Sequence, residues 1–222
     1  MKLLTCLVLL ISPFSYAEDT VKEPVLSQTY KITFQSNWNA IDHKKVPGPA
    51  HFSPVVAVVH NSNYDLLPVG TVAGKGLEMV AELGNPDLIN KEITAAMTTG
   101  NVSETLNTKN MFISSQLSQS FELTVTNHHP YISFASMIAP SPDWIVGLSN
   151  LKLYSKEAGF YSGINKPMPL LAIDAGTENG DVGGNFSLMN RPTQPQGAIS
   201  ILTGSGFDAP FAYITIEPVA KP

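Results

Sequence analysis

An acidic segment that contains two glycines carries the side chains best suited to binding a cation. In IDAGTENGD, Asp174 and Glu178 are four residues apart, with one glycine between them, a second glycine after them and Asp181 close behind. Calcium takes about six to eight oxygen ligands, and flexible loops rich in carboxylates and backbone carbonyls supply them. The segment lacks the acid spacing of an EF-hand loop. Two interpretations stay open: a calcium-binding loop, or a turn whose Asp and Gly serve only its own backbone.

A further acid, Asp143, lies in the segment APSPDWIVG between two apolar runs. The prolines and the serine before it are typical of a turn, and Asp143 could serve that turn as well. It could also bind a metal together with Asp174 and Glu178, if its loop lies at the same end of the fold. We expect Trp144 to be a core or rim residue that fixes the loop.

The sequence motifs for catalysis are weaker than the acidic segments that indicate cation binding. His51 and His60 flank a predicted strand, and a zinc enzyme needs three ligands and an open position, yet the chain has no HExxH motif. It has no GxSxG motif either, and nothing in the spacing joins Ser53, His51 and Asp143 into a triad. A metal-dependent hydrolase that uses the same acids, with His51 or His128 as general base, is the alternative to a non-catalytic function.

The N-terminal residues predict export. Lys2 precedes an apolar run over 3–11, and Ser15-Tyr16-Ala17 places small residues before a cleavage site. We therefore predict a secretory signal peptide over 1–17, a leader over 18–29 and a periplasmic or extracellular protein. The apolar run is far shorter than the ~20 residues that span a membrane, so we expect no transmembrane segment after signal removal.

The cysteine content and the net charge exclude several kinds of binding site and partner. Cys6 is the only cysteine, so the exported chain can contain neither a disulfide nor a cysteine zinc site. The formal net charge is −5, and it falls to −6 when the signal peptide removes Lys2. An acidic chain without a basic cluster is a poor nucleic-acid binder, so we expect no nucleic-acid partner.

The elements that must position these acids are mostly short strands. Alternating or β-branched patterns predict strands over 30–38, 51–60, 118–127, 131–140, 144–154, 170–176 and 211–219. The shifting apolar faces of 144–154 indicate a bulge near Ser149 and Asn150. Helical spacing predicts helices over 76–83 and 86–97. The pattern favours an all-β fold, an antiparallel β-sandwich with one or two short helices in its connections, formed by one domain over 30–219.

Four segments in order resemble the spondin domain family, the domain of F-spondin and mindin, which also occurs in exported bacterial proteins of similar size. They are HFSPVVAVVHNSNYDLLPVG, GLEMVAELG, MIAPSPDWIVGLSNLKLY and DAGTENG. The resemblance implies an antiparallel β-sandwich with one calcium ion at one end. Carried over residue by residue, it implies that Asp143, Asp174 and Glu178 contribute to the calcium site. Glu178 stands where the family motif usually has Asp, and its side chain is longer by one methylene.

The resemblance implies a binding or adhesion role without catalysis. We expect the partner to be a protein, a glycan or a lipid surface, recognised by loops that calcium orders. Two alternatives stay open: the metal-dependent hydrolase described above, and a structural subunit of an envelope assembly that uses exposed strand edges.

Overall fold

The computed structural model describes residues 24–114, 116–180, 186, 188–190, 197–204 and 206–220. The predicted signal peptide over 1–17, the first half of the predicted leader and Asp181 lie outside the described residues. The first described strand begins at Ser27, so the last three residues of the predicted leader belong to it.

The structure is built mainly from strands. Its elements are β1 (Ser27–Ser36), α1 (Ala40–His43), β2 (His51–Phe52), β3 (Val56–His60), α2 (Lys75–Leu83), α3 (Asp87–Thr98), β4 (Val102–Asn107), β5 (Met111–Phe112), β6 (Ser118–Thr126), β7 (Tyr131–Ala139), β8 (Trp144–Lys152), β9 (Tyr154–Ser155), β10 (Gly159–Phe160), β11 (Ile164–Leu170), β12 (Ile173–Asp174), β13 (Asn179–Gly180), β14 (Leu188–Asn190), β15 (Ser200–Ile201) and β16 (Ala212–Pro218).

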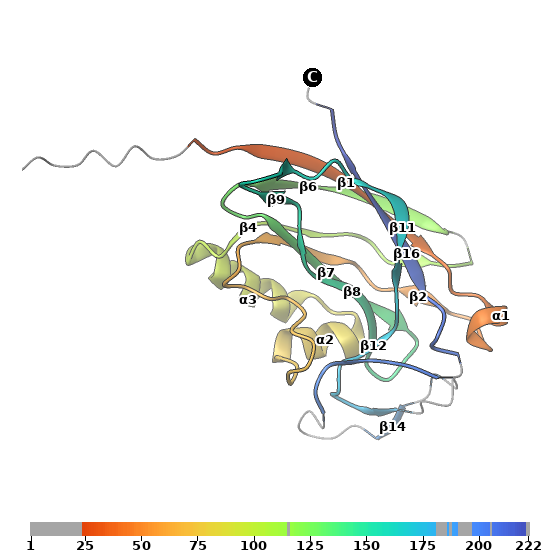
Figure 1. Ribbon diagram of the computed structural model, residues 1–222. Helices are drawn as coiled ribbons and strands as arrows, with labels where there is room; N and C mark the ends of the chain where they lie inside the picture. Colours follow the sequence, from red (N-terminus) through yellow and green to blue (C-terminus); the bar gives the residue numbers. More distant parts are fainter. Residues whose placement is uncertain are drawn as a thin grey trace, which may run out of the picture.

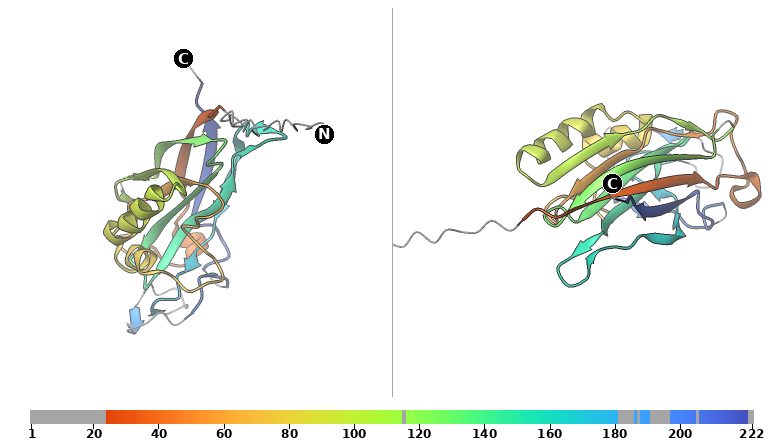
Figure 2. Two further views of the ribbon diagram at one scale, coloured as in Figure 1. Left: turned by 90° about the vertical axis from the view of Figure 1, so that its left-hand side faces the viewer. Right: turned by 90° about the horizontal axis from the view of Figure 1, so that it is seen from above.

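Two antiparallel sheets pack face to face, as the sequence predicts. One sheet has the strand order β11-β16-β1-β6, and the other has the order β15-β12-β8-β7-β2-β5, with β3 and β4 joined to it through β7. Figure 1 shows the two sheets and the helices α2 and α3, which lie on the side of the larger sheet away from β1 and β16. The views in Figure 2 agree on this order of layers. The fold is therefore an antiparallel β-sandwich with a helical layer outside it.

The three layers explain why β3 is apolar from Val56 to Val59. Ala57 and Val59 pack in the cluster between the two sheets, whereas Val56 and Val58 pack in the cluster beneath the helices. Successive side chains of a strand point to opposite faces, so a strand covered on both faces reads as a continuous apolar run.

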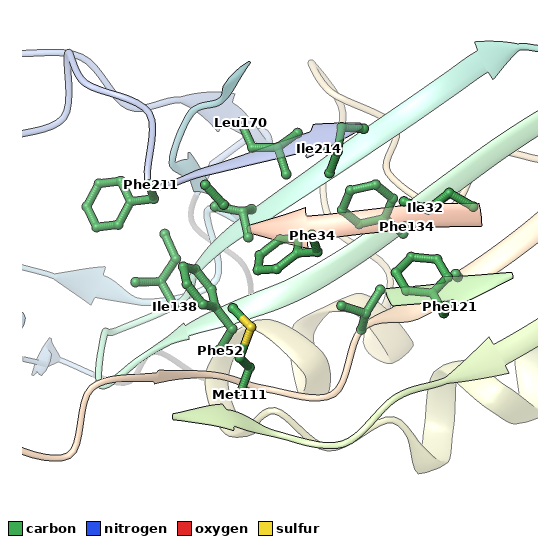
Figure 3. Close-up of a cluster of buried hydrophobic side chains, with 14 of the residues drawn as sticks. Ile32, Phe34, Phe52, Met111, Phe121, Phe134, Ile138, Leu170, Phe211 and Ile214 are labelled. Atoms are coloured by element: carbon green, nitrogen blue, oxygen red, sulfur yellow. The ribbon is translucent and has the colours of Figure 1, made fainter. Parts of the chain in front are cut away.

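Aromatic side chains fill the space between the sheets. The Phe34 ring lies edge-on to Phe52, with centroids 5.0 Å apart, and edge-on to Phe134 at 6.4 Å. Phe121 meets Phe134 at 6.4 Å in the same arrangement. Figure 3 shows these rings among the aliphatic side chains of both sheets. Such offset contacts add to the stabilisation from burial alone.

Three local features differ from or refine the sequence prediction. The strand predicted over 51–60 is interrupted, because Pro54 has no N–H to donate to a ladder. A third helix, α1, begins after Asn39, whose side chain accepts hydrogen bonds from two backbone N–H groups. The predicted bulge is confirmed: Ser149 and Asn150 together oppose Ser133 of β7.

The β7–β8 turn and the loop after β12 lie at the same end of the sandwich. The described ends of the chain lie at the other end, where Val219 N–H donates to the carbonyl of Thr29. Figure 1 shows β12 and β14 far from the C-terminus. No helix in the described part of the chain is long and apolar enough to cross a membrane.

Candidate metal centre

The pairing of β8 with β12 brings the two predicted acidic segments together. Ile173 faces Ile145 and Asp174 faces Trp144 across the antiparallel ladder. One residue further on, Ala175 N–H donates to the carbonyl of Asp143 at 3.2 Å. Two segments about thirty residues apart in sequence thus become neighbours through strand register.

The PSPDW turn takes its cap from the serine. The Trp144 N–H donates to Ser141 Oγ at 3.0 Å, and the bond between Ala139 and Pro140 is cis. Trp144 is 1% exposed and packs against the rings of Phe186 and Phe207, so it is a core residue. The turn therefore leaves the side chain of Asp143 available for contacts outside it.

The Asp143 carboxylate is fully buried and holds the loop after β12. Its Oδ2 accepts hydrogen bonds from Thr177 N at 2.6 Å, from Glu178 N at 3.0 Å and from Thr177 Oγ1 at 3.2 Å. Its Oδ1 is buried and has no hydrogen-bond partner among the described residues. One oxygen of this carboxylate thus anchors the loop, and the other is left without a donor.

Asp174 lies close enough to Asp143 for the two charges to interact. Its Oδ1 accepts the Gly176 N–H at 2.7 Å. Burial, followed by the negative charge of Asp143, raises the pKa of Asp174 to about 6, although the Gly176 hydrogen bond acts in the opposite direction. A hydrogen bond that the protonated Asp174 carboxyl makes with Asp143 also raises this pKa. Two neighbouring carboxylates disfavour ionisation of one another unless a cation or a proton intervenes.

Gly176 permits the loop to turn back over this pair. Its φ is +70°, and a Cβ built there would lie 2.6 Å from the carbonyl oxygen of Gly197. The Gly197 N–H donates to the Gly176 carbonyl at 3.0 Å. A cavity of about 270 Å³ opens beside this contact, and it is lined by Asp174, Gly176, Glu178, Asn179, Gly197, Ala198 and Ser200.

The donor set of Asp143 and Asp174 fits a hard cation. A buried carboxylate oxygen without a donor, next to a second carboxylate, is the kind of group that Ca²⁺ coordinates. Glu178 is 5% exposed and lines the cavity with Asp174. Within the described residues, however, no group of three or more His, Cys, Asp and Glu side chains is arranged to hold a metal. A complete shell would therefore also need backbone carbonyls or water.

The histidines considered as general bases lie elsewhere. The ring of His51 contacts that of Phe112 in a tilted arrangement, with centroids 4.8 Å apart, and its Nδ1 lies 2.8 Å from the Pro49 carbonyl oxygen. His128 is exposed in the β6–β7 turn. Neither lines the acidic cavity, so neither of these two histidines is placed to act as a base there.

The Ser53, His51 and Asp143 side chains do not form a triad. Ser53 Oγ accepts the N–H of Met137 at 2.8 Å, and the Asp143 carboxylate is engaged with Thr177. The imagined Ser-His-Asp arrangement is absent from these three residues.

A buried polar cluster at the β8 bulge was missed by sequence reasoning. His60 is fully buried; its Nε2 lies 2.8 Å from Ser133 Oγ, which accepts the N–H of Asn150 at 2.8 Å. Asp65 accepts a hydrogen bond from the Asn150 side chain at 2.9 Å. The predicted bulge was the only sequence signal for this cluster, which supports β8 away from the acidic end.

Comparison with known proteins identifies the family. The family model Spondin_N matches residues 28–220. The chain is 34% identical to Spondin-1 of Gallus gallus over 181 residues and 32% identical to Spondin-2 of Rattus norvegicus over 208 residues, which are 78% and 86% of this chain. It spans only 22% of the length of the former and 59% of the latter. The match covers nearly the whole sandwich, and the chain belongs to the Spondin_N family.

Proposed function

We propose that this chain is an exported, non-catalytic binding domain whose loops are ordered by one calcium ion at Asp143 and Asp174, with Glu178 nearby. The partner is a protein, a glycan or a lipid surface that contacts the loops at this end of the sandwich. The resemblance to the secreted spondin proteins supports export and an adhesion-type function, and the N-terminal pattern supports export independently.

The observation that carries the proposal is the Oδ1 atom of Asp143. It is buried without a hydrogen-bond partner among the described residues, while Oδ2 of the same carboxylate accepts three hydrogen bonds. A buried polar atom without a partner costs about 1–3 kcal/mol, and more when it is charged. A bound cation would remove that cost and the repulsion between Asp143 and Asp174.

Asp143 and Asp174 would have different structural roles at such a site. Calcium would supply positive charge at the two carboxylates, and no reaction is assigned to it. Asp143 ties the loop after β12 to the β7–β8 turn through Thr177 and Glu178. Asp174 holds the start of the same loop through Gly176. Neutralising the two charges would stabilise both connections, and a more rigid loop surface loses less entropy when a partner binds.

The test is calcium titration of the mature protein by isothermal titration calorimetry, with thermal unfolding in parallel. We expect one site and a rise in Tm, since a ligand that binds only the folded state stabilises it. Asp174→Asn should weaken binding at least tenfold. Asp87→Asn, which removes the same charge from the exposed first turn of α3, should leave calcium affinity unchanged.

Absence of calcium binding by the wild-type protein would refute the metal assignment. An equal loss in the Asp87→Asn control would show that net charge, and not this site, governs the response.

A further inference from the structure

The sequence contains one Asn-Gly pair, Asn179-Gly180, and the structure places it beside the acidic cavity. Asn179 lines this cavity together with Asp174 and Glu178, and it is exposed to solvent. The proposed calcium site depends on carboxylates and gives Asn179 no role. A reaction that turns this amide into a carboxylate would change the charge of the cavity.

An asparagine that precedes glycine is chemically labile. The backbone nitrogen after an asparagine can attack the side-chain amide carbon, and glycine hinders this attack least because it has no Cβ. Here the new bond joins the Gly180 nitrogen to Cγ of Asn179, and the bond between Cγ and Nδ2 breaks. Ammonia leaves with the proton of the Gly180 N–H, and a cyclic succinimide remains. Water then opens the ring to aspartate or isoaspartate, so a neutral amide becomes a carboxylate.

The local structure favours this reaction. Asn179 and Gly180 form β13, which pairs with β14 in a two-stranded sheet separate from both main sheets, and the register shifts between the two residues. Figure 1 shows β14 beyond the main sheets. A two-stranded ribbon is marginally stable at best on its own, so opening it costs little free energy. Opening frees the Gly180 N–H and allows the Asn179 side chain to rotate towards it.

Asn61 provides a contrast within the same chain, because it also precedes a small residue, Ser62. Its side chain is held at both ends: Nδ2 donates to the Gly100 carbonyl at 3.2 Å, and Oδ1 accepts the Asn63 N–H at 2.9 Å. Rotation of this amide towards the Ser62 nitrogen would break both hydrogen bonds. Asn61 is therefore an internal reference for a slow reaction.

A carboxylate at position 179 would join Asp174 and Glu178 in the lining of the cavity. Like charges close together disfavour the ionised form of each other, so the cavity without a cation would become less stable. The affinity of a calcium site rises with the number of charged ligands around it. The same added charge therefore has opposite effects on the calcium-free and the calcium-bound protein.

We propose that Asn179 is a site of spontaneous deamidation, and that its aspartate product destabilises the calcium-free protein and tightens calcium binding at the acidic cavity. The effect on calcium rests on the proposed function. The reaction itself and the loss of calcium-free stability do not.

The first experiment follows deamidation of the mature wild-type protein during incubation with EGTA at mildly alkaline pH. Peptide mapping by mass spectrometry measures the replacement of NH₂ by OH at each asparagine. We expect Asn179 to react about tenfold faster than Asn61, because its side chain is exposed and its ribbon opens readily. Gly180→Ala, which adds a Cβ beside the attacking nitrogen, should slow the reaction about tenfold. Reaction at Asn179 no faster than at Asn61 would overturn the modification site.

The second experiment compares Asn179→Asp with Asn63→Asp, which adds the same charge at an exposed position outside the cavity lining. In EGTA, Asn179→Asp should lower Tm by about 1–2 °C, as expected for a partly screened repulsion. In calorimetric titration it should bind calcium about three- to tenfold more tightly than wild type. Asn63→Asp should leave both quantities unchanged.

The outcomes separate this inference from the metal assignment. Equal effects of the two aspartate substitutions, or an Asn179→Asp protein with the Tm and calcium affinity of wild type, would overturn the effect on the cavity. If Asn179 reacts quickly and Asn179→Asp lowers Tm in EGTA, but neither protein binds calcium, the deamidation site is supported and the metal assignment fails alone.

Discussion

The contrast between Asp143→Asn and Asp143→Ala separates the structural role of this side chain from a calcium-binding role. Both substitutions remove the charge, but only asparagine retains an oxygen for the donors on Thr177 and Glu178. Its amide NH₂ would occupy the position of Oδ1, which has no donor in the described structure, and could donate to Asp174. The two variants should therefore differ greatly without calcium.

The hydrogen bonds give the magnitude. Alanine leaves the backbone N–H groups of Thr177 and Glu178 buried without an acceptor, at about 1–3 kcal/mol each. We expect a loss of about 3–5 kcal/mol in the free energy of unfolding, or about 6–20 °C in Tm for a domain of this size. Asparagine keeps both hydrogen bonds and removes the repulsion from Asp174, so its calcium-free stability should stay within about 1 kcal/mol of wild type.

Calcium should stabilise the wild-type protein much more than the Asp143→Asn variant. At a concentration 100 times Kd, the wild-type protein should gain about 2.7 kcal/mol. If losing one carboxylate weakens binding about 100-fold, the same concentration stabilises the asparagine variant by only about 0.4 kcal/mol. In Tm these gains correspond to about 5–11 °C and about 1–2 °C.

Differential scanning calorimetry with EGTA and with saturating calcium measures all of these quantities. A calcium response of wild-type size in Asp143→Asn would refute the role of this carboxylate in binding. A calcium-free Asp143→Ala protein as stable as wild type would refute the loop-anchoring role derived from the hydrogen bonds.

Three further substitutions test other parts of the fold. Burial lowers the pKa of His60, although the charge of Asp65 opposes the shift and that of His129 adds to it. The neutral His60 side chain therefore contributes fully to stability above the unfolded pKa of about 6.5, and this contribution declines as the pH falls towards the folded pKa. Urea unfolding at pH 7.5 and 5.5 should show a smaller loss in His60→Gln than in wild type. Gly176→Ala should cost about 2–4 kcal/mol in thermal unfolding, because it adds a backbone clash to a left-handed conformation, and should weaken calcium binding. Phe134→Ala, at a core position 1% exposed, should cost about 3–5 kcal/mol in urea unfolding while leaving calcium affinity unchanged.

The sandwich was predictable because its strands carry periodic signals of their own. The strand predicted over 131–140 appears as Tyr131–Ala139, and the helix predicted over 76–83 appears as Lys75–Leu83 with its stop at Gly84. The short helix α1 was not predictable, because four residues are too few for helical periodicity. The break after β2 was marked by Pro54, but the apolar residues beyond it concealed the interruption.

The arrangement of the acids could not be predicted from local sequence patterns, because it depends on which strands pair. Nothing in IDAGTENGD indicates that Asp174 faces Trp144, because that register arises from the contact between β8 and β12. The sequence likewise did not indicate that the Thr177 hydroxyl would donate a hydrogen bond to the Asp143 carboxylate. The family resemblance grouped Asp143 with Asp174 where spacing alone could not.

The identity of residue 143 bears directly on the proposed calcium site. Ser141 already caps the PSPDW turn, so turn geometry does not require an acid at position 143. An asparagine would accept the same N–H groups from Thr177 and Glu178 without placing a charge in a fully buried position. A buried carboxylate is costly unless a cation, a proton or further donors compensate it. Among the described residues only one of its oxygens accepts a hydrogen bond, and a cation bound at the other oxygen is the compensation that the proposed calcium site would supply.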